Sequence, residues 1–426
     1  LVFPDRTPKP GYYDMKRAYQ PFTVTLADGV LTVFNKRYFT TLNDMKMVWS
    51  VTQNGKEIVS GETSPLSVEP RECTEYDLEL DLPELYGECY LTVRMVQVVS
   101  TPWAQSGYEI GFEQFKLDSL PMEKRPKPLT AVGVRDSRRV LALEGNGTVY
   151  LFDKSYGKLT GMLVNGKNLF AAPMEIQLWM AHPRNLIESI AEQRKIGSMH
   201  KIRQKTYSFD YERVGNDVKV TAKVALGGAR VVPVIKGEIT WLVCTDGSVR
   251  VSFIGEKNKL APSLPRFGFV VPLVSGFENM EYFGLGPNES YLDRREASRM
   301  AHFETKVKDN FVHYVNPREN SAHASTLFGA VKDRNGGGLM VSACEERGIL
   351  FNASHYSTEM LENTMHDDEL VPSENTFVTV DAYIEPFGGH GIYDESEPSR
   401  VWNENEISFS FRMQTVSDED DLFELV

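Results

Sequence analysis

Apolar and polar residues alternate with a period of two along much of this 426-residue chain. Phe22, Val24 and Leu26 alternate with threonines, Asp28-Gly29 follows, and the alternation resumes after this pair. This pattern predicts a β-hairpin, because successive side chains of a strand point to opposite faces and an Asp-Gly pair suits a tight turn. The same alternation recurs at 218–224, at 239–244 and 249–253 on either side of a turn, and at 407–411. The sequence therefore predicts an all-β protein of antiparallel sheets, each with one buried face.

Helical periodicity is confined to a short segment. Leu186, Ile187, Ile190 and Ala191 would share one face of a helix that Gly197 limits to about three turns. We expect this helix to be a decoration on the β scaffold.

Charged residues and two prolines interrupt both periodicities at 122–128 and predict a linker. The linker separates a unit of roughly 120 residues from one of roughly 300, sizes that suit a sandwich and a larger two-sheet structure. We therefore expect one domain at 21–123 and a second at 129–415. Residues 416–426 form an acidic tail, whose like charges at 417–421 favour a solvated end.

Acidic residues outnumber basic ones by 59 to 46, so the net charge is −13. No stretch concentrates lysine and arginine as a nucleic-acid-binding surface does, and we expect no nucleic-acid partner. The sequence also has no run of 18 apolar residues and does not open with a signal peptide. We expect no membrane association and a cytoplasmic location.

Cys73, Cys89, Cys244 and Cys344 are far apart and form no close pair. The eight histidines are equally dispersed. Metal sites and disulfide frameworks use short, regular spacings, so we expect reduced thiols in the core and no metal ion bound by this chain.

Residues 284–295 read Gly-Leu-Gly-Pro-Asn-Glu-Ser-Tyr-Leu-Asp-Arg-Arg. This segment resembles one that is characteristic of the C-terminal domain of the large family 2 β-galactosidases. The opening at 1–10 resembles the segment that follows the catalytic barrel of that family. Softer matches fall in the family's order across nearly the whole chain; they include Thr101-Pro102-Trp103, Phe152 to Leu159 and Tyr314 to Asn320.

The resemblance implies an immunoglobulin-like β-sandwich followed by a large antiparallel supersandwich of galactose-mutarotase type, with 1–20 as the segment after the barrel. It implies that the parent enzyme hydrolyses terminal β-galactosides by a retaining mechanism through a covalent glycosyl intermediate. The acid and the nucleophile would lie in the barrel, as would the divalent and monovalent cations, so this chain would hold no catalytic residue and no cofactor. Its implied role is to brace the barrel, supply one wall of the sugar site and contribute contacts to a homo-oligomer.

Two departures from the family's motifs mark the expected substrate-binding residues. Where the family reads Trp-Arg-Ala-Pro-x-Asp-Asn-Asp, this chain retains Asn185 but lacks the cation and both acids. Where the family places a tryptophan platform after Gly-Gly-Asp, this chain has Gly389, His390 and Tyr393, and a tyrosine ring also stacks on the apolar face of a sugar. The alternative for this loop is an ordinary turn with Tyr393 as a packed aromatic residue. A third departure places Ser-Ala-His at 321–323, where the family has Gly-x-Arg.

Other candidate sites have structural alternatives. Asn288-Glu289 is reminiscent of the catalytic motif of barrel glycosidases, but no β/α alternation surrounds it, and a loop in which Glu289 holds backbone groups or Arg294 explains it better. His355 or His366 with Glu319 could act as the acid and base of an aldose epimerase, although a shared fold does not carry a function. Four tryptophans are expected in cores or domain contacts, namely Trp49, Trp103, Trp241 and Trp402.

Three functions stay open on the sequence alone. The first is the part of a β-galactosidase-like hydrolase described above. The second is a non-catalytic carbohydrate-binding module or a separately encoded small subunit. A stand-alone aldose epimerase is the third.

Overall fold

The computed structural model describes residues 1–78, 80, 82–123, 130–182, 198–229, 232–386 and 405–426. Two compact units make up the chain. Unit 1 comprises Leu1–Lys124 with Glu296–His302, and unit 2 comprises Arg125–Arg295 with Phe303–Val426. The fold is all-β, as the alternation predicts, and helices are few and short.

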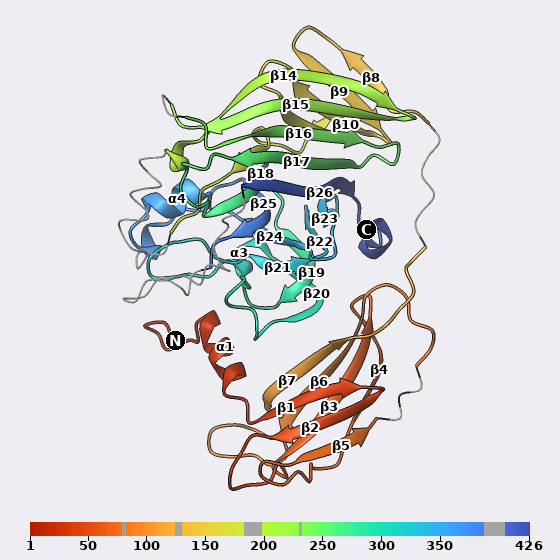
Figure 1. The fold of residues 1–426 in the computed structure, drawn as a ribbon, viewed down its shortest axis with the longest axis vertical. Coiled ribbons are helices and arrows are strands. Elements are labelled where there is room, and N and C mark those ends of the chain that lie inside the picture. The colour runs from red at the N-terminus through yellow and green to blue at the C-terminus, as the bar shows by residue number, and fades with distance from the viewer. Residues whose placement is uncertain (79, 81, 124–129, 183–197, 230–231, 387–404) are drawn as a thin grey trace. The chain divides into compact units, whose positions relative to one another are not determined.

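Unit 1 is an immunoglobulin-like sandwich of seven strands, drawn in red to orange in Figure 1. Its sheets have the orders β1-β2-β5 and β4-β3-β6-β7, and every ladder between these strands is antiparallel. The elements are α1 (Pro10–Ala18), β1 (Phe22–Ala27), β2 (Val30–Asn35), β3 (Met45–Gln53), β4 (Lys56–Glu62), β5 (Cys73–Asp77), β6 (Cys89–Gln97) and β7 (Glu109–Lys116). Inward-facing residues of both sheets, such as Val33 and Val93, form one buried core. Helix α1 is held to β7 by an ion pair of 2.5 Å between Arg17 and Glu113.

The predicted first hairpin is present. Strands β1 and β2 pair with Leu26 opposite Leu31, and Asp28 and Gly29 make the turn with φ of 49° and 80°. Both turn residues are in the left-handed region, which a two-residue turn of this type requires. The Asp28-Gly29 turn between two alternating segments was therefore enough to predict this hairpin.

The described residues of unit 2 form three antiparallel sheets. Their orders are β12-β11-β10-β9-β8, β13-β18-β25-β24-β21 and β14-β15-β16-β17-β26-β23-β22-β19-β20. The first sheet comprises β8 (Gly133–Asp136), β9 (Val140–Gly145), β10 (Thr148–Asp153), β11 (Lys158–Val164) and β12 (Lys167–Asn168). The second comprises β13 (Glu175–Gln177), β18 (Arg266–Leu273), β21 (His323–Thr326), β24 (Ile349–Ser354) and β25 (Thr376–Ile384).

The third sheet has nine strands in the described part of the chain, and Figure 1 shows β14 to β17 following one another across it. Its strands are β14 (Arg203–Val214), β15 (Asp217–Gly227), β16 (Ile235–Val243), β17 (Val249–Lys257), β19 (Asn279–Gly286), β20 (Arg299–Lys306), β22 (Phe328–Lys332), β23 (Gly338–Ala343) and β26 (Glu406–Val416). Among the described residues of unit 2, the helical elements are η1 (Met199–Lys201), α3 (Val307–Asn310), α4 (Thr358–Asn363), η2 (Asp367–Glu369) and η4 (Leu422–Leu425).

The main core of unit 2 lies where the five-stranded sheet containing β18 meets the nine-stranded sheet. Phe269 of β18 packs on Phe411 of β26 with ring centroids 5.3 Å apart, and Phe253 and Trp241 are buried in the same cluster. Side chains alternate along each strand, so only one face of the β18 sheet packs into this core. The opposite face carries the cavity described below.

Several residues depart from their expected positions. Trp103 is 67% exposed in the loop between β6 and β7 and Cys73 is exposed on β5, so neither belongs to a core. The acidic run at 417–421 is largely exposed, but the chain after it is not a solvated tail. Leu422 of η4 is buried, and Phe423 packs edge-on against Phe328 at a centroid distance of 4.9 Å. The acidic run favours a solvated end, so the sequence did not predict that the apolar residues directly after it would pack against unit 2.

Two expectations fall outside the described residues, namely the helix around 186–191 and the position of Trp402. No helix in the described part of the chain is long and apolar enough to cross a membrane.

Candidate functional site

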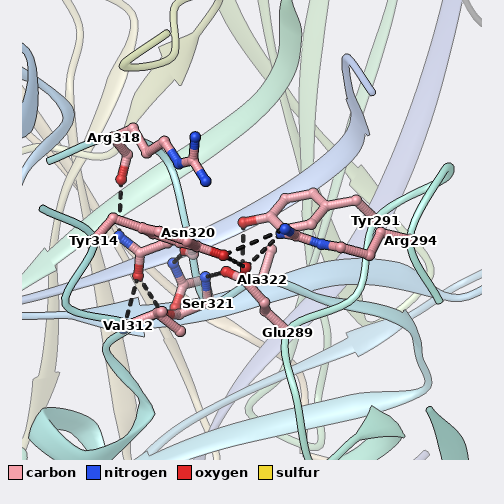
Figure 2. Close-up of polar contacts among 10 residues, drawn as sticks. Glu289, Tyr291, Arg294, Val312, Tyr314, Arg318, Asn320, Ser321 and Ala322 are labelled. Carbon is pink, nitrogen blue, oxygen red and sulfur yellow. Dashed lines mark hydrogen bonds and ion pairs between the residues drawn. The ribbon is translucent and has the colours of Figure 1, made fainter. Parts of the chain in front are cut away.

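The loop after β19 encloses the carboxylate of Glu289. Figure 2 shows this carboxylate meeting the side chains of Arg294 and Tyr314, both of which donate hydrogen bonds to Oε1. The backbone N–H of Ser321 donates to Oε2 at 2.6 Å. Glu289 is only 4% exposed. It therefore holds a backbone group and Arg294, which is the structural alternative expected from the sequence.

Aromatic residues seal this network. Tyr291 is fully buried, its hydroxyl accepts a hydrogen bond from the backbone N–H of Ala322, and burial raises its pKa well above the ordinary value (Figure 2). Burial and the adjacent Glu289 carboxylate likewise raise the pKa of Tyr314. Both phenols stay neutral and donate or accept hydrogen bonds, so the network stabilises the loop and offers no nucleophile.

A second buried ionic group lies on β18 and β25. Arg266 donates from Nε to Asp381 Oδ1 at 2.7 Å, from Nη2 to Asp381 Oδ2 at 2.6 Å, and from Nη1 to Glu319 Oε2 at 2.9 Å. Burial opposes the charge of Arg266, but the two carboxylates raise its pKa above the ordinary value. The Arg266 guanidinium thus hydrogen-bonds to two carboxylates at once. Burial raises the pKa of both the Glu319 and the Asp381 carboxyl groups.

A cavity of about 710 Å³ opens on the outer face of the β18 sheet. Its floor consists of side chains that alternate with core residues along three neighbouring strands. Cross-strand pairing sets Val270, Thr379 and Asn352 in one row and Pro272, Phe377 and Ser354 in the next. The residues between them, such as Phe269 and Val380, point into the core.

Walls for this cavity come from segments on either side of the sheet. Trp179 lies on one wall, and its indole Nε1 donates to Glu362 Oε2 of α4 at 2.5 Å. Gln177 Nε2, at the end of β13, donates to Thr358 Oγ1 at 2.7 Å, which adds a second hydrogen bond to α4. Arg266 and Glu319 close one end. Volumes of this size are typical of small-molecule sites.

The histidines proposed for epimerase chemistry are not brought together with Glu319. His355 Nε2 lies 2.9 Å from Glu278 Oε2 and its Nδ1 lies 3.2 Å from the carbonyl oxygen of Asn375. His366 is exposed beside η2. Because Glu319 is bound to Arg266, the expected acid and base do not form a pair.

The residues expected to bind substrate, Asn185, Gly389, His390 and Tyr393, lie outside the described residues, and their role stays a prediction. Sequence reasoning missed Arg266, Asp381 and the Trp179–Glu362 pair. A signal was available for the first two, since Arg266 begins an otherwise apolar strand and Asp381 is the single charged residue of β25. Charges in such positions are buried only when they are paired.

Comparisons with known proteins agree with this architecture. A family profile described as "Beta galactosidase small chain" matches residues 144–413, and one described as "Beta-galactosidase, domain 4" matches residues 31–118. The chain is 26% identical over 426 residues to a β-galactosidase of Staphylococcus xylosus, covering 98% of this chain and 42% of that protein. It is also 26% identical over 390 residues to a β-galactosidase of Priestia megaterium, covering 89% of this chain and 37% of that protein.

Among solved structures, galactose 1-epimerase from Lactobacillus acidophilus NCFM superposes on 68% of this chain and 99% of its own, at 11% identity and a TM-score of 0.36. The chain spans about two fifths of the length of the two β-galactosidases. The small-chain profile alone covers more than half of the residues and includes both the Glu289 loop and the cavity floor. On this match, the chain belongs to the β-galactosidase small chain family.

Proposed function

We propose that the chain is the carboxy-terminal part of a β-galactosidase-like glycoside hydrolase. In this proposal it braces the catalytic barrel and supplies one wall of the sugar site, while the barrel provides the acid, the nucleophile and the bound cations. The parent hydrolyses terminal β-galactosides with retention, as a homo-oligomer in the cytoplasm. Tyr393, His390, Gly389 and Asn185 contact the substrate.

The observation that carries this proposal is the state of the buried carboxylates. Retaining hydrolysis needs two carboxyl groups about 5 Å apart, one of them free to protonate the leaving group and the other free to attack. In unit 2, Glu289 is bound by Arg294, and Glu319 and Asp381 are both bound by Arg266. An arginine that holds a carboxylate by direct hydrogen bonds occupies its lone pairs. These three acids therefore suit a supporting part better than a catalytic centre.

A chimera tests the proposal. The matching region of the Staphylococcus xylosus relative is replaced by this chain, and hydrolysis of a chromogenic β-galactoside is compared between the chimera, the truncated relative and the chain alone. We expect turnover by the chimera, little by the truncated relative and none by the chain. Turnover by the purified chain that disappears in Glu289→Gln would overturn the proposal, as would a folded chimera that has no activity.

A further inference from the structure

We infer that the cavity on the outer face of the β18 sheet is itself a binding site for a neutral saccharide unit. The inference goes beyond the proposed function, because it concerns binding by this chain alone and names residues outside the predicted substrate loops. Every residue that defines the cavity belongs to unit 2.

The floor has an apolar side and a polar side. Val270 and Pro272 lie on β18, whereas Asn352 and Ser354 lie on β24, with β25 between them. A pyranose ring has the matching asymmetry, because its C–H groups form an apolar surface while its hydroxyls project from the edge. The β24 side is polar but hydrogen-bonded within the fold, since Asn352 Nδ2 donates to the carbonyl oxygen of Asn320 and Ser354 Oγ accepts from the backbone N–H of Tyr356.

The β25 strand contributes an unused hydroxyl. Thr379 is 9% exposed, and its Oγ1 has no hydrogen-bond partner among the described residues. Gln177 Oε1 also has none, although its Nε2 is engaged with Thr358. Buried polar atoms are rarely left without a partner, so a ligand that offers hydroxyl groups would satisfy atoms that the fold leaves open.

The charges select for a neutral ligand. Four glutamates line the cavity, namely Glu175, Glu319, Glu359 and Glu362, against one lysine and one arginine, Lys201 and Arg266. Arg266 is the buried cation, and all of its bonds to acids go to Asp381 and Glu319. A phosphate group would therefore meet carboxylates without an available guanidinium fork, and like charges in a shielded site repel.

Aromatic side chains complete the walls. Trp179 is oriented by its hydrogen bond to Glu362, and Phe311 packs on Tyr356 with ring centroids 4.4 Å apart. Rings that are fixed in this way lose little conformational entropy when a sugar contacts them. The site thus combines a rigid apolar surface with hydrogen-bonding groups at one edge.

Calorimetric titration of the purified chain tests the inference, with methyl β-D-galactopyranoside and galactose 6-phosphate as probes at low ionic strength. We expect the neutral galactoside to bind with a dissociation constant on the order of millimolar and the phosphate to bind several-fold more weakly. Thr379→Val keeps the shape and removes the hydroxyl, so the affinity for the galactoside should fall about three- to tenfold while the melting temperature is unchanged or higher. Thr240→Val, on β16 of the nine-stranded sheet, is the matched control and should bind as the parent does.

Two further variants keep the inference falsifiable. Ser354→Phe should fill the floor and abolish binding, and its melting curve shows whether unit 2 stays folded. The double variant Glu359→Gln with Glu362→Gln removes two negative charges but keeps a side-chain oxygen that can accept the hydrogen bond of Trp179. In this variant the affinities for the galactoside and for galactose 6-phosphate should become more similar. Absence of galactoside binding, equal binding of both probes, or full affinity in folded Thr379→Val and Ser354→Phe would each overturn the inference. None of these results alters the chimera experiment, which measures hydrolysis.

Discussion

Gly268 and Asp381 are paired across β18 and β25, and a Cβ on Gly268 would lie 1.9 Å from Asp381 Oδ1. The missing side chain is what lets the Asp381 carboxylate lie against the neighbouring strand and reach Arg266. Glycine weakens a strand interior, so its presence here marks a close approach.

Gly268→Ala should therefore destabilise unit 2. The added methyl group displaces Asp381 from Arg266, and disturbing a buried ion pair in this way costs about 3 kcal/mol. Thermal unfolding should show a melting temperature lower by several degrees. Gly133→Ala on β8 is the control, because its Cβ would make ordinary contact with Glu144 at 3.5 Å. An unchanged melting temperature for Gly268→Ala would mean that Asp381 relaxes at no cost.

Glu289→Gln should reduce stability without a specific effect on turnover. The amide keeps one acceptor but loses the charge that binds Arg294, at a cost of about 3 kcal/mol. We expect a lower melting temperature of the chimera and a kcat per folded molecule that is the same within a factor of about two. Glu212→Gln, at an exposed position on β14, should change neither quantity. A kcat reduced by orders of magnitude at an unchanged melting temperature would assign Glu289 to catalysis.

The stability of unit 2 should fall in mild acid because of His323. This residue is fully buried, stacks on Tyr282 at a centroid distance of 4.1 Å, and has Nε2 2.8 Å from Asn310 Oδ1. Burial lowers the pKa of His323 from 6.5 to about 4. Between these values the unfolded chain binds a proton that the folded chain does not, so stability falls as the pH decreases from 6.5 to 4.

The full loss from this histidine is on the order of 3 kcal/mol. Denaturant unfolding at a series of pH values measures it. Glutamine is neutral at every pH, so His323→Gln should reduce the change in stability between pH 6.5 and 4. His366→Gln, at an exposed position, should leave that pH dependence unchanged. An identical slope in His323→Gln would show that other groups cause the acid sensitivity.

Tyr393 tests the predicted sugar platform. In the chimera, Tyr393→Ala should reduce kcat/KM about five- to tenfold with an unchanged melting temperature, because an aromatic contact of this kind is worth on the order of 1 kcal/mol. Tyr393→Trp should be tolerated, since it restores the family's usual residue. A destabilised Ala variant with unchanged kinetics would instead make Tyr393 a packed structural residue.

Local patterns were reliable where the fold depends on neighbours in sequence. Asp28-Gly29 predicted both a turn and the pairing of β1 with β2, because two left-handed residues close a two-residue loop. The loop at 284–295 likewise predicted that Glu289 would hold Arg294, five residues away. The acidic run at 417–421 misled, since charge gave no sign that Phe423 would return to pack on Phe328.

The sequence by itself determined the all-β class, the hairpins and the family, because alternation, turn residues and motif order are properties of contiguous segments. Only the tertiary structure decided the partners of Arg266, since Asp381 is 115 residues away along the chain and Glu319 is 53. It also decided the cavity floor, which exists because the sheet order β13-β18-β25-β24 sets side by side strands that the chain keeps far apart. Alternation says which residues share a face of one strand, but the neighbours across the sheet depend on which strands pair, and that choice is made by burial of the whole core.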